Sequence, residues 1–263
     1  MESTEAKYLK ITLSKYDLER YRRQMLIPGW GKEGQRKLKS ATVVVVGAGG
    51  LGGFASVYLV AVGIGKLVII DREKFELSNL NRQILGWQKD IGHFKAEAAA
   101  EKLKAFNPEV EVEPVIAEIR KENAHELIDN ADVVVDAMDN WETRFIVNNT
   151  CVEKRTPFVH AGVFGLYGQL TTIIPGKGPC LRCILPETPN EISEFPIPGV
   201  TPGFFATLQV IESLKLIVGL GETLTGRMLL FDGEDMRFKI INVKKRPDCP
   251  VCARVQPKTI RRH

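Results

Sequence analysis

The sequence has 263 residues, of which 44% are hydrophobic and 26% are charged, and its formal net charge is +4. This balance is typical of a soluble globular protein with one large α/β domain, and so mild a positive charge permits an anionic ligand without indicating nucleic acid. No apolar run reaches the roughly 18–20 residues of a membrane span, and residues 1–15 lack the apolar core of a signal peptide. We therefore expect a cytoplasmic protein that does not span a membrane, in which the five cysteines do not form disulfides.

The pattern of apolar residues predicts strands and helices that alternate along the chain. Residues 16–40 are helical in pattern and rich in charge, and 43–46 form a run of valines typical of a buried parallel strand. The next elements are expected, in chain order, as helix 54–62, strand 66–70, helix 95–106, strand 110–115, helix 123–128, strand 132–135, helix 143–154 and strand 158–162. This alternation predicts a doubly wound α/β fold with a mostly parallel sheet.

The pattern changes after about residue 165. Residues 169–174 are expected as an antiparallel strand, 204–218 as a helix, and 228–232 with 237–243 as a hairpin around Gly233. The intervening segment 186–202 is rich in proline and is expected as a long loop, which is often functional when it is ordered. The parallel sheet is thus expected to be extended by antiparallel strands.

A glycine-rich turn follows the first predicted strand. Gly47, Gly49 and Gly52 match the pattern G-x-G-x-x-G between a strand and a helix. The first glycine permits a tight turn, the second lets the backbone approach a phosphate, and the third allows the helix to pack closely on the strand. Asp71 ends the next strand, where a carboxylate can bind ribose hydroxyls. The pattern predicts a Rossmann-like nucleotide site, and it leaves open whether the ligand is NAD or ATP.

Charged residues that a dehydrogenase does not need follow later strands. Arg82, Lys95 and Asp139 fall at the carboxyl ends of strands, beside the glycine turn. Each one alone is more often a solvated surface charge, but together they suit a displacement at phosphorus. Arg82 and Lys95 would stabilise charge on the phosphates and the leaving pyrophosphate, and Asp139 would hold Mg²⁺.

Two C-x₂-C pairs predict a metal site. Cys180 with Cys183, and Cys249 with Cys252, supply the four thiolates of a tetrahedral structural Zn²⁺ site, which leaves no open position for catalysis. The alternative is a redox C-x-x-C motif, but two such pairs at these places would be unusual. Cys151 remains, and its apolar neighbours within a predicted helix indicate a buried structural thiol.

With these motifs in this order, from about Tyr16 to Cys252, the sequence resembles the MoeB/ThiF family, the bacterial and archaeal relatives of ubiquitin-activating enzymes. Its layout is most similar to that of MoeB. The residues that carry the resemblance are Arg20 to Gln24, Gly47, Gly49, Gly50, Gly52, Asp71, Asn79, Arg82, Gln83, Lys95, Asp139 and the four cysteines of the two pairs.

The resemblance implies a helical segment at 1–40 and a ThiF-type adenylation domain at 41–263, with a nucleotide-binding half at 41–165 and a zinc-stapled, partner-binding half at 166–263. It implies ATP in the glycine turn, formed by Gly47, Gly49, Gly50 and Gly52, with Asp71 on the ribose. Asn79, Arg82 and Lys95 would contact the phosphates, Gln83 belongs to the same nucleotide site, and Asp139 would support Mg²⁺. Arg23 would reach into the site of a neighbouring subunit, which implies a homodimer.

The implied reaction is ATP-dependent adenylylation of the C-terminal Gly-Gly carboxylate of a small β-grasp, ubiquitin-like sulfur carrier of the MoaD or ThiS type, with release of pyrophosphate. The carboxylate is already ionised at pH 7, so no general base is required. Many relatives carry a cysteine in the loop that corresponds to 186–202, and this loop has none, which predicts adenylylation without a covalent thioester. No rhodanese-like sulfur domain is expected, because the sequence ends at His263.

Several alternatives stay open. An NAD-dependent oxidoreductase would explain the glycine turn and Asp71, but not the later charged residues or the cysteine pairs. The altered loop and a basic tail also keep open a relative that adenylylates another carboxylate, a peptide or a tRNA base, or that binds ATP without catalysis. The basic residues of that tail are Lys244, Lys245, Arg246, Arg254, Lys258, Arg261 and Arg262. A pure binding module is disfavoured by the charged residues, and the pathway (molybdopterin, thiamin, cysteine or tRNA thiolation) is not determined.

Overall fold

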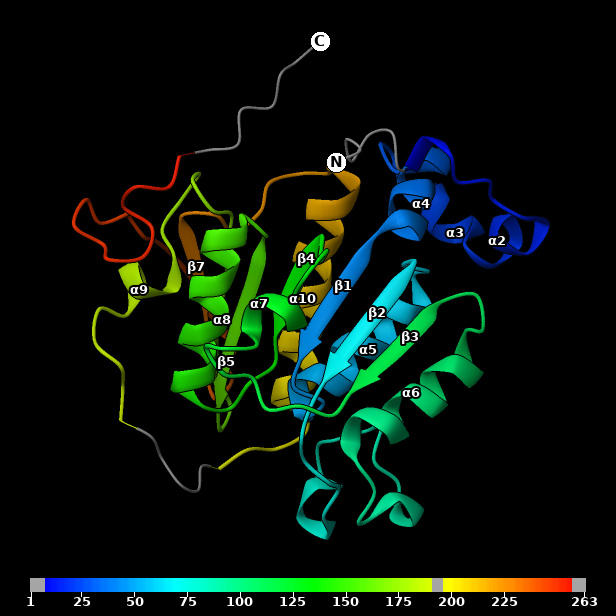
Figure 1. Cartoon of the computed structure of the whole chain (residues 1–263), viewed down its shortest axis with the longest axis horizontal. Helices are drawn as coiled ribbons and strands as arrows, with labels where there is room; N and C mark the ends of the chain where they lie inside the picture. Colours follow the sequence, from blue (N-terminus) through cyan, green and yellow to red (C-terminus); the bar gives the residue numbers. More distant parts are fainter. Residues whose placement is uncertain (1–7, 191–195, 257–263) are drawn as a thin grey trace.

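A computed structural model describes residues 8–190 and 196–256, and within them eight strands form one sheet in the order β3-β2-β1-β4-β5-β6-β7-β8 (Figure 1). The strands are β1 (Thr42–Val46), β2 (Lys66–Ile70), β3 (Glu111–Val115), β4 (Val133–Asp136), β5 (Phe158–Phe164), β6 (Tyr167–Ile173), β7 (Arg227–Asp232) and β8 (Arg237–Asn242). The helices are α2 (Lys15–Arg20), α3 (Arg22–Met25), α4 (Gly31–Ser40), α5 (Gly50–Ala61), α6 (Lys95–Phe106), α7 (Ala124–Leu127), α8 (Trp141–Lys154), α9 (Leu181–Ile184) and α10 (Val200–Val218).

The sheet is parallel in its first part and antiparallel in its second. β1 pairs in parallel with β2 and with β4, β2 with β3, and β4 with β5. From β5 onward the pairs β5–β6, β6–β7 and β7–β8 are all antiparallel. The predicted fold class is therefore confirmed. β2 lies on one side of β1 in the sheet and β4 lies on the other, so the strand order reverses at β1. In doubly wound sheets, ligands bind at such a reversal of strand order.

Helices cover both faces of the parallel part, and the valines of β1 show why. Val43 and Val45 belong to a core shared with α5, α6 and α10, whereas Val44 and Val46 belong to a core shared with α7 and α8. Successive residues of a strand point to opposite faces, so a strand buried on both faces is apolar at every position. Figure 1 shows α5 and α10 on one side of the strands and α7 and α8 on the other.

Most predicted elements occur within a few residues of their expected bounds, and β2 and α6 match them. Three differences have physical causes. The predicted helical segment 16–40 is divided into α2, α3 and α4, with a break at residues 26–30 that includes Pro28. α5 begins at Gly50, so part of the expected glycine turn is its first helical turn. α10 begins at Val200, and it tolerates Pro202 in its first turn, where a missing N–H costs no helical hydrogen bond.

The two edges of the sheet differ in charge. On β3, Glu111 and Glu113 are exposed, and both pair with Lys66 of β2, at 2.8 and 2.5 Å. Pro114 of β3 removes one backbone donor from that edge. On β8, the exposed residues include Arg237, Phe238, Lys239 and Ile240.

In the described part of the chain, no helix is both long enough and apolar enough to cross a bilayer. Two predictions fall partly outside the described residues. Residues 191–195 of the proline-rich loop are not described, and the described remainder, 186–190 and 196–199, is not helical. Lys258, Arg261 and Arg262 of the basic tail also lie outside the described residues.

Candidate active site

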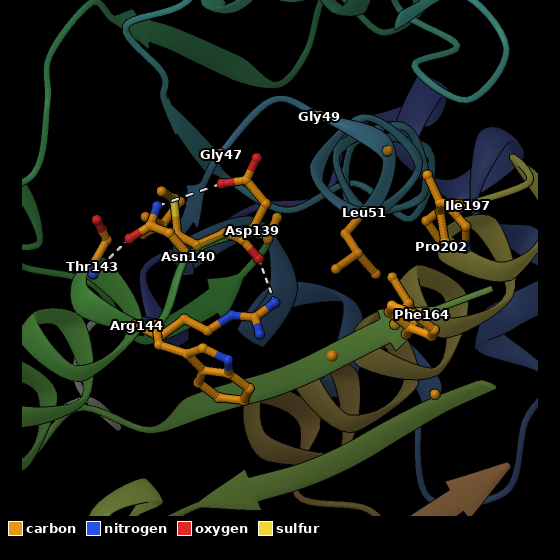
Figure 2. Close-up of a pocket in the computed structure, with 18 of the residues that line it drawn as sticks. Gly47, Gly49, Leu51, Asp139, Asn140, Thr143, Arg144, Phe164, Ile197 and Pro202 are labelled. Carbon is orange, nitrogen blue, oxygen red and sulfur yellow. Dashed lines mark hydrogen bonds between the residues drawn. The ribbon is translucent and has the colours of Figure 1, made fainter. Parts of the chain in front are cut away.

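One large cavity lies at the carboxyl ends of β1, β2 and β4 and continues beside the antiparallel strands. Its volume is about 1000 Å³. Its walls come from the glycine turn, the ends of β2 and β4, the start of α8, the β5–β6 and β7–β8 strands, and parts of the proline-rich segment. Figure 2 shows Asp139, Asn140, Thr143 and Arg144 in one region and Leu51, Phe164, Ile197 and Pro202 in another, with the glycine turn above them. The cavity thus joins the region of the predicted nucleotide site to the antiparallel extension.

The glycine turn has the geometry that its pattern predicts. Gly47 has φ +99°, and a Cβ there would lie 2.6 Å from the Ala137 carbonyl oxygen. A Cβ on Gly52 would lie 1.8 Å from the Gly47 carbonyl oxygen, so this glycine lets α5 pack against the end of β1. Gly49 and Gly50 line the cavity at the N-terminus of α5. The first-turn N–H groups of a helix lack partners within it, so this end can bind an anion.

Asp71 is held in place at the end of β2. Its Oδ2 accepts a hydrogen bond of 2.7 Å from the Ala48 N–H, and its Oδ1 accepts one of 2.7 Å from the Glu73 N–H. Burial raises the pKa of the Asp71 carboxyl, and the two backbone donors and Lys95 oppose that rise. Asp71 lines the cavity, and its fixed carboxylate retains lone pairs that can accept hydrogen bonds from a diol.

Arg82 and Lys95 reach the same region from different elements. Arg82 follows the short 3₁₀ helix Leu77–Asn79, and its Nη1 donates to the Ser78 carbonyl at 3.0 Å and to Asn81 Oδ1 at 2.9 Å. Lys95 is the first residue of α6 and is 3% exposed, and its Nζ lies 2.7 Å from Glu73 Oε2. Both line the cavity, so two positive charges converge beside the glycine turn.

Asp139 and Gln83 complete the set of predicted residues that line the cavity. Asp139 is exposed and follows β4, and its Oδ1 lies 3.4 Å from the Asn140 Nδ2 donor. Asn140 caps α8 by accepting the Thr143 N–H at 2.9 Å, which fixes the turn that carries Asp139. Gln83 is buried near Gly49, and its Oε1 has no hydrogen-bond partner within residues 8–190 and 196–256. Gln83 therefore retains an acceptor for a ligand.

Three residues of the predicted nucleotide site, Gly52, Asn79 and Arg23, do not line the cavity, and Gly52 packs against Gly47 instead. Asn79 is buried, and its Oδ1 accepts the Glu76 N–H at 3.1 Å, so it closes the 3₁₀ turn that precedes Arg82. Arg23 is exposed on α3, near the opposite end of β1 from the glycine turn (Figure 1). Within one chain, Arg23 is therefore remote from the cavity.

A buried ionic network that the sequence did not predict adjoins the cavity, which its member Arg144 helps to line. His160 Nδ1 lies 2.6 Å from Asp136 Oδ2, and Arg144 Nε lies 3.5 Å from the same oxygen. Arg144 also donates to the carbonyls of Met138 and Ala161, and Asp136 Oδ1 accepts the Met138 N–H at 3.0 Å. The sequence offered one indication of this network, the acidic residue Asp136 at the end of a predicted strand. Its partners, Arg144 on α8 and His160 on β5, lie on other elements and could not be identified from it. The network fixes the turn that leads to Asp139.

Burial lowers the pKa of His160, although its hydrogen bond with Asp136 opposes this change. Arg144 already supplies a cation to Asp136, so His160 need not carry a charge. The buried Nε2 of His160 has no hydrogen-bond partner among the described residues. A neutral ring with its proton on Nδ1 avoids a buried N–H without an acceptor.

The four paired cysteines meet in one buried cluster. Their sulfur atoms all lie within 4.8 Å of one another. Burial raises the pKa of Cys180 and raises that of Cys252 to about 11. Burial also acts on Cys249, but backbone N–H groups of Cys252 and Val251 lower its pKa to about 7. Four thiols at this spacing, with backbone donors that stabilise a thiolate, fit a tetrahedral metal ion. Cys151 is separate and fully buried in α8, as predicted, and burial raises its pKa.

The fold and the cavity are those of a Rossmann-like nucleotide-binding protein, which also has a cluster of four cysteines. The sequence profile of the ThiF family matches residues 21–251, so the chain belongs to the ThiF family. Together with the relatives named below, this membership makes the chain an adenylyltransferase. The predicted family and enzyme class are confirmed, and the oxidoreductase and non-catalytic alternatives lose their support.

The chain is 43% identical over 249 residues to the SAMP-activating enzyme E1 of Haloferax volcanii, with 93% of this chain and 92% of the relative covered. It is 40% identical over 249 residues to the sulfur carrier protein adenylyltransferase of Thermus thermophilus, with 91% and 92% covered. The fold is similar to that of the Escherichia coli MccB complex with MccA-N7isoASN, with a TM-score of 0.82 and 26% identity, covering 94% of this chain and 76% of the other.

Proposed function

We propose that the protein uses ATP and Mg²⁺ to adenylylate the C-terminal Gly-Gly carboxylate of a small β-grasp, ubiquitin-like sulfur carrier. The observation that carries the proposal is the continuity of one cavity from the glycine turn to Phe238 and Lys239 of β8. A nucleotide at one end and an extended chain terminus at the other would then meet within one cavity. Two relatives that are more than 30% identical to this chain support this class of acceptor. One is named as a SAMP-activating enzyme, and the other as a sulfur carrier protein adenylyltransferase.

In the proposed reaction, a carboxylate oxygen of the carrier attacks the α-phosphorus of ATP. A new bond forms between that oxygen and phosphorus, the bond to the bridging oxygen breaks, and pyrophosphate leaves with the electron pair. The glycine turn would bind phosphate, Asp71 the ribose hydroxyls, and Arg82 and Lys95 the growing charge on the leaving group. Asp139 would hold Mg²⁺, which prefers carboxylate and phosphate oxygens. Gln83 would accept a hydrogen bond from the nucleotide, and Asn79 would act by shaping the turn before Arg82.

The proposed product is the acyl-adenylate, without a protein thioester. Cys151 is buried within α8, and the remaining four cysteines form the cluster. The proline-rich loop, residues 186–202, contains no cysteine that could form a thioester. We propose that the cluster holds a structural Zn²⁺, because four thiolates fill a tetrahedral site and leave no position for substrate. ATP and carrier proteins are available in the cytoplasm, where we propose that the enzyme acts.

The first experiment is isotope exchange between labelled pyrophosphate and ATP, in the presence of Mg²⁺, with and without a β-grasp protein ending in Gly-Gly. Exchange should require the carrier, because pyrophosphate re-enters ATP only through the acyl-adenylate. Lys95→Ala and Asp139→Ala should each lower the rate by about 100-fold or more, the usual cost of removing a group that stabilises transition-state charge. Glu97→Gln, an exposed change on α6 outside the cavity, is the control and should keep the wild-type rate.

A second candidate is adenylylation of the C-terminal carboxylate of a short peptide. The similarity of the whole fold to MccB, whose solved complexes include MccA, favours this alternative. Exchange that needs a peptide and ignores every Gly-Gly carrier would support it. Exchange with neither acceptor would contradict both forms of the proposal.

A further inference from the structure

The two cations of the nucleotide region have different charge environments. Arg82 Nη1 donates to two neutral oxygens, and Arg82 has no ion pair within the described residues. Lys95, in contrast, is paired with Glu73, whose Oε2 lies 2.7 Å from its Nζ. Both cations and Glu73 line the cavity. Among the described residues, no carboxylate compensates the charge of Arg82, whereas Glu73 compensates that of Lys95.

Burial of the pair is unequal. The Lys95 side chain is 4% exposed, whereas the Glu73 side chain is 56% exposed. Lys95 also begins α6, where the positive end of the helix dipole adds to its charge, and no side chain caps this end. A buried ammonium in this position needs an anion close by. The lysine is thus fixed, and the carboxylate can turn into water.

Glu73 is tied to Lys95 through the backbone as well. The Lys95 N–H donates to the Glu73 carbonyl at 2.9 Å, and the Glu73 N–H donates to Asp71 at 2.7 Å. These bonds hold the main chain of Glu73 between the carboxylate expected on the ribose and the lysine expected on the phosphates. Its side chain can therefore move without displacing either neighbour.

We infer that Glu73 is the resident counter-ion of Lys95, and that a phosphate group of the nucleotide displaces it. This inference rests on the proposed function, because it assigns Lys95 to phosphate. Glu73 stabilises the empty site and weakens the binding of every polyphosphate, since the pair must break before phosphate reaches Lys95. It therefore sets the affinity of the site for ATP and for released pyrophosphate.

The test measures the affinity of the full-length, metal-loaded protein for inorganic pyrophosphate by titration calorimetry. Glu73→Gln should bind pyrophosphate roughly three- to tenfold more tightly than wild type, as expected for the loss of one competing, half-exposed ion pair. Glu97→Gln removes a negative charge two residues from Lys95 without touching its ammonium, and should stay within about twofold of wild type. Unchanged or weaker binding by Glu73→Gln, or no pyrophosphate binding to wild type, would overturn the inference.

Two further measurements separate a counter-ion from a merely structural residue. Adenosine lacks phosphate, so its affinity should be the same in wild type and Glu73→Gln; an equal gain for adenosine would contradict the inference. Glu73→Asp keeps the charge but shortens the side chain, and its pyrophosphate affinity should fall between those of wild type and Glu73→Gln, which provides a test if Glu73→Gln does not fold. Loss of carrier-dependent exchange with these affinities intact would count against the proposed function alone.

Discussion

At the scale of single residues, Asp136 does more than end a strand. Its two carboxylate oxygens receive the Met138 N–H and His160, and Arg144 approaches one of them. The guanidinium carbon of Arg144 also lies 4.8 Å from the Trp141 ring centroid, which braces it at the cavity wall. These contacts hold the turn between β4 and α8, so the position of Asp139 depends on side chains from β4, β5 and α8.

The buried His160 predicts a pH-dependent stability. Burial lowers its folded-state pKa below 6.5, so the unfolded chain binds the proton more readily as the pH falls through 6.5, and stability is lost on acidification. The free energy of unfolding should drop by about 1 kcal/mol from this group between roughly pH 7.5 and 5.5. Urea denaturation of wild type and His160→Gln at both pH values checks this. The variant should lose that part of the pH dependence; an unchanged pH dependence would mean that folding does not alter the pKa of His160.

Residues whose role depends on local backbone geometry could be predicted from the sequence. Gly47, Gly52 and Asp71 lie in one strand–turn–helix–strand unit, and the structure places them as the pattern requires. The partnership of Asp136 with Arg144 and His160 could not be predicted, because it joins three elements whose contacts arise from tertiary packing. The same reason explains why Glu73 gave no signal as a partner of Lys95, 22 residues away.

At the scale of elements, the segment 196–202 links the two regions of the cavity. The Gly165 N–H donates to the Pro196 carbonyl at 2.7 Å, and Thr201 Oγ1 donates to the Gly165 carbonyl at 2.8 Å. At the nucleotide region, a Cβ on Gly199 would lie 2.4 Å from the Asn81 carbonyl oxygen. The backbone beside Arg82 therefore packs directly against a segment that is also fastened to the β5–β6 turn.

The proposed metal site predicts a specific loss of stability. The cluster fastens the C-terminal segment around Cys249 and Cys252 to the short helix α9, so removing the ion should release both. Cys252→Ser should contain less than one zinc per chain and unfold roughly 10 °C below wild type, since a bound structural metal contributes directly to folding. Metal analysis with thermal unfolding measures both effects. Cys151→Ala, which leaves the cluster intact, should keep its zinc; equal zinc in Cys252→Ser would exclude the four-thiolate site.

Element types were predictable where periodicity and propensity agree, as in β2 and α6. The start of α5 was missed because Gly50, Gly52 and Gly53 disfavour a helix by propensity. Here Gly52 permits close packing on Gly47, and tertiary contact overrides the intrinsic preference. The division of the chain into 1–40 and 41–263, with halves at 41–165 and 166–263, stays a prediction.

At the scale of the whole molecule, Arg23 is the predicted site residue that a single chain leaves remote from its cavity. A homodimer in which each subunit lends Arg23 to the other would resolve this separation. Arg23→Ala and Lys95→Ala should each be inactive alone in pyrophosphate exchange. A refolded equimolar mixture should regain about a quarter of the wild-type rate, because half of randomly formed dimers would contain one complete site of two. A mixture as inactive as its components would rule out a site shared in this way.

The opposite charges of the two sheet edges have a consequence for assembly. β3 presents Glu111 and Glu113, and β8 presents Arg237 and Lys239. Head-to-tail pairing of β8 with β3 of another molecule would be electrostatically attractive, and such a contact repeats without closing, so it would build a filament. Lys66 pairs with both glutamates and offsets one of their two negative charges, and Pro114 interrupts the row of donors on β3. Both features weaken this edge as a pairing surface, so we expect them to oppose the growth of such a filament.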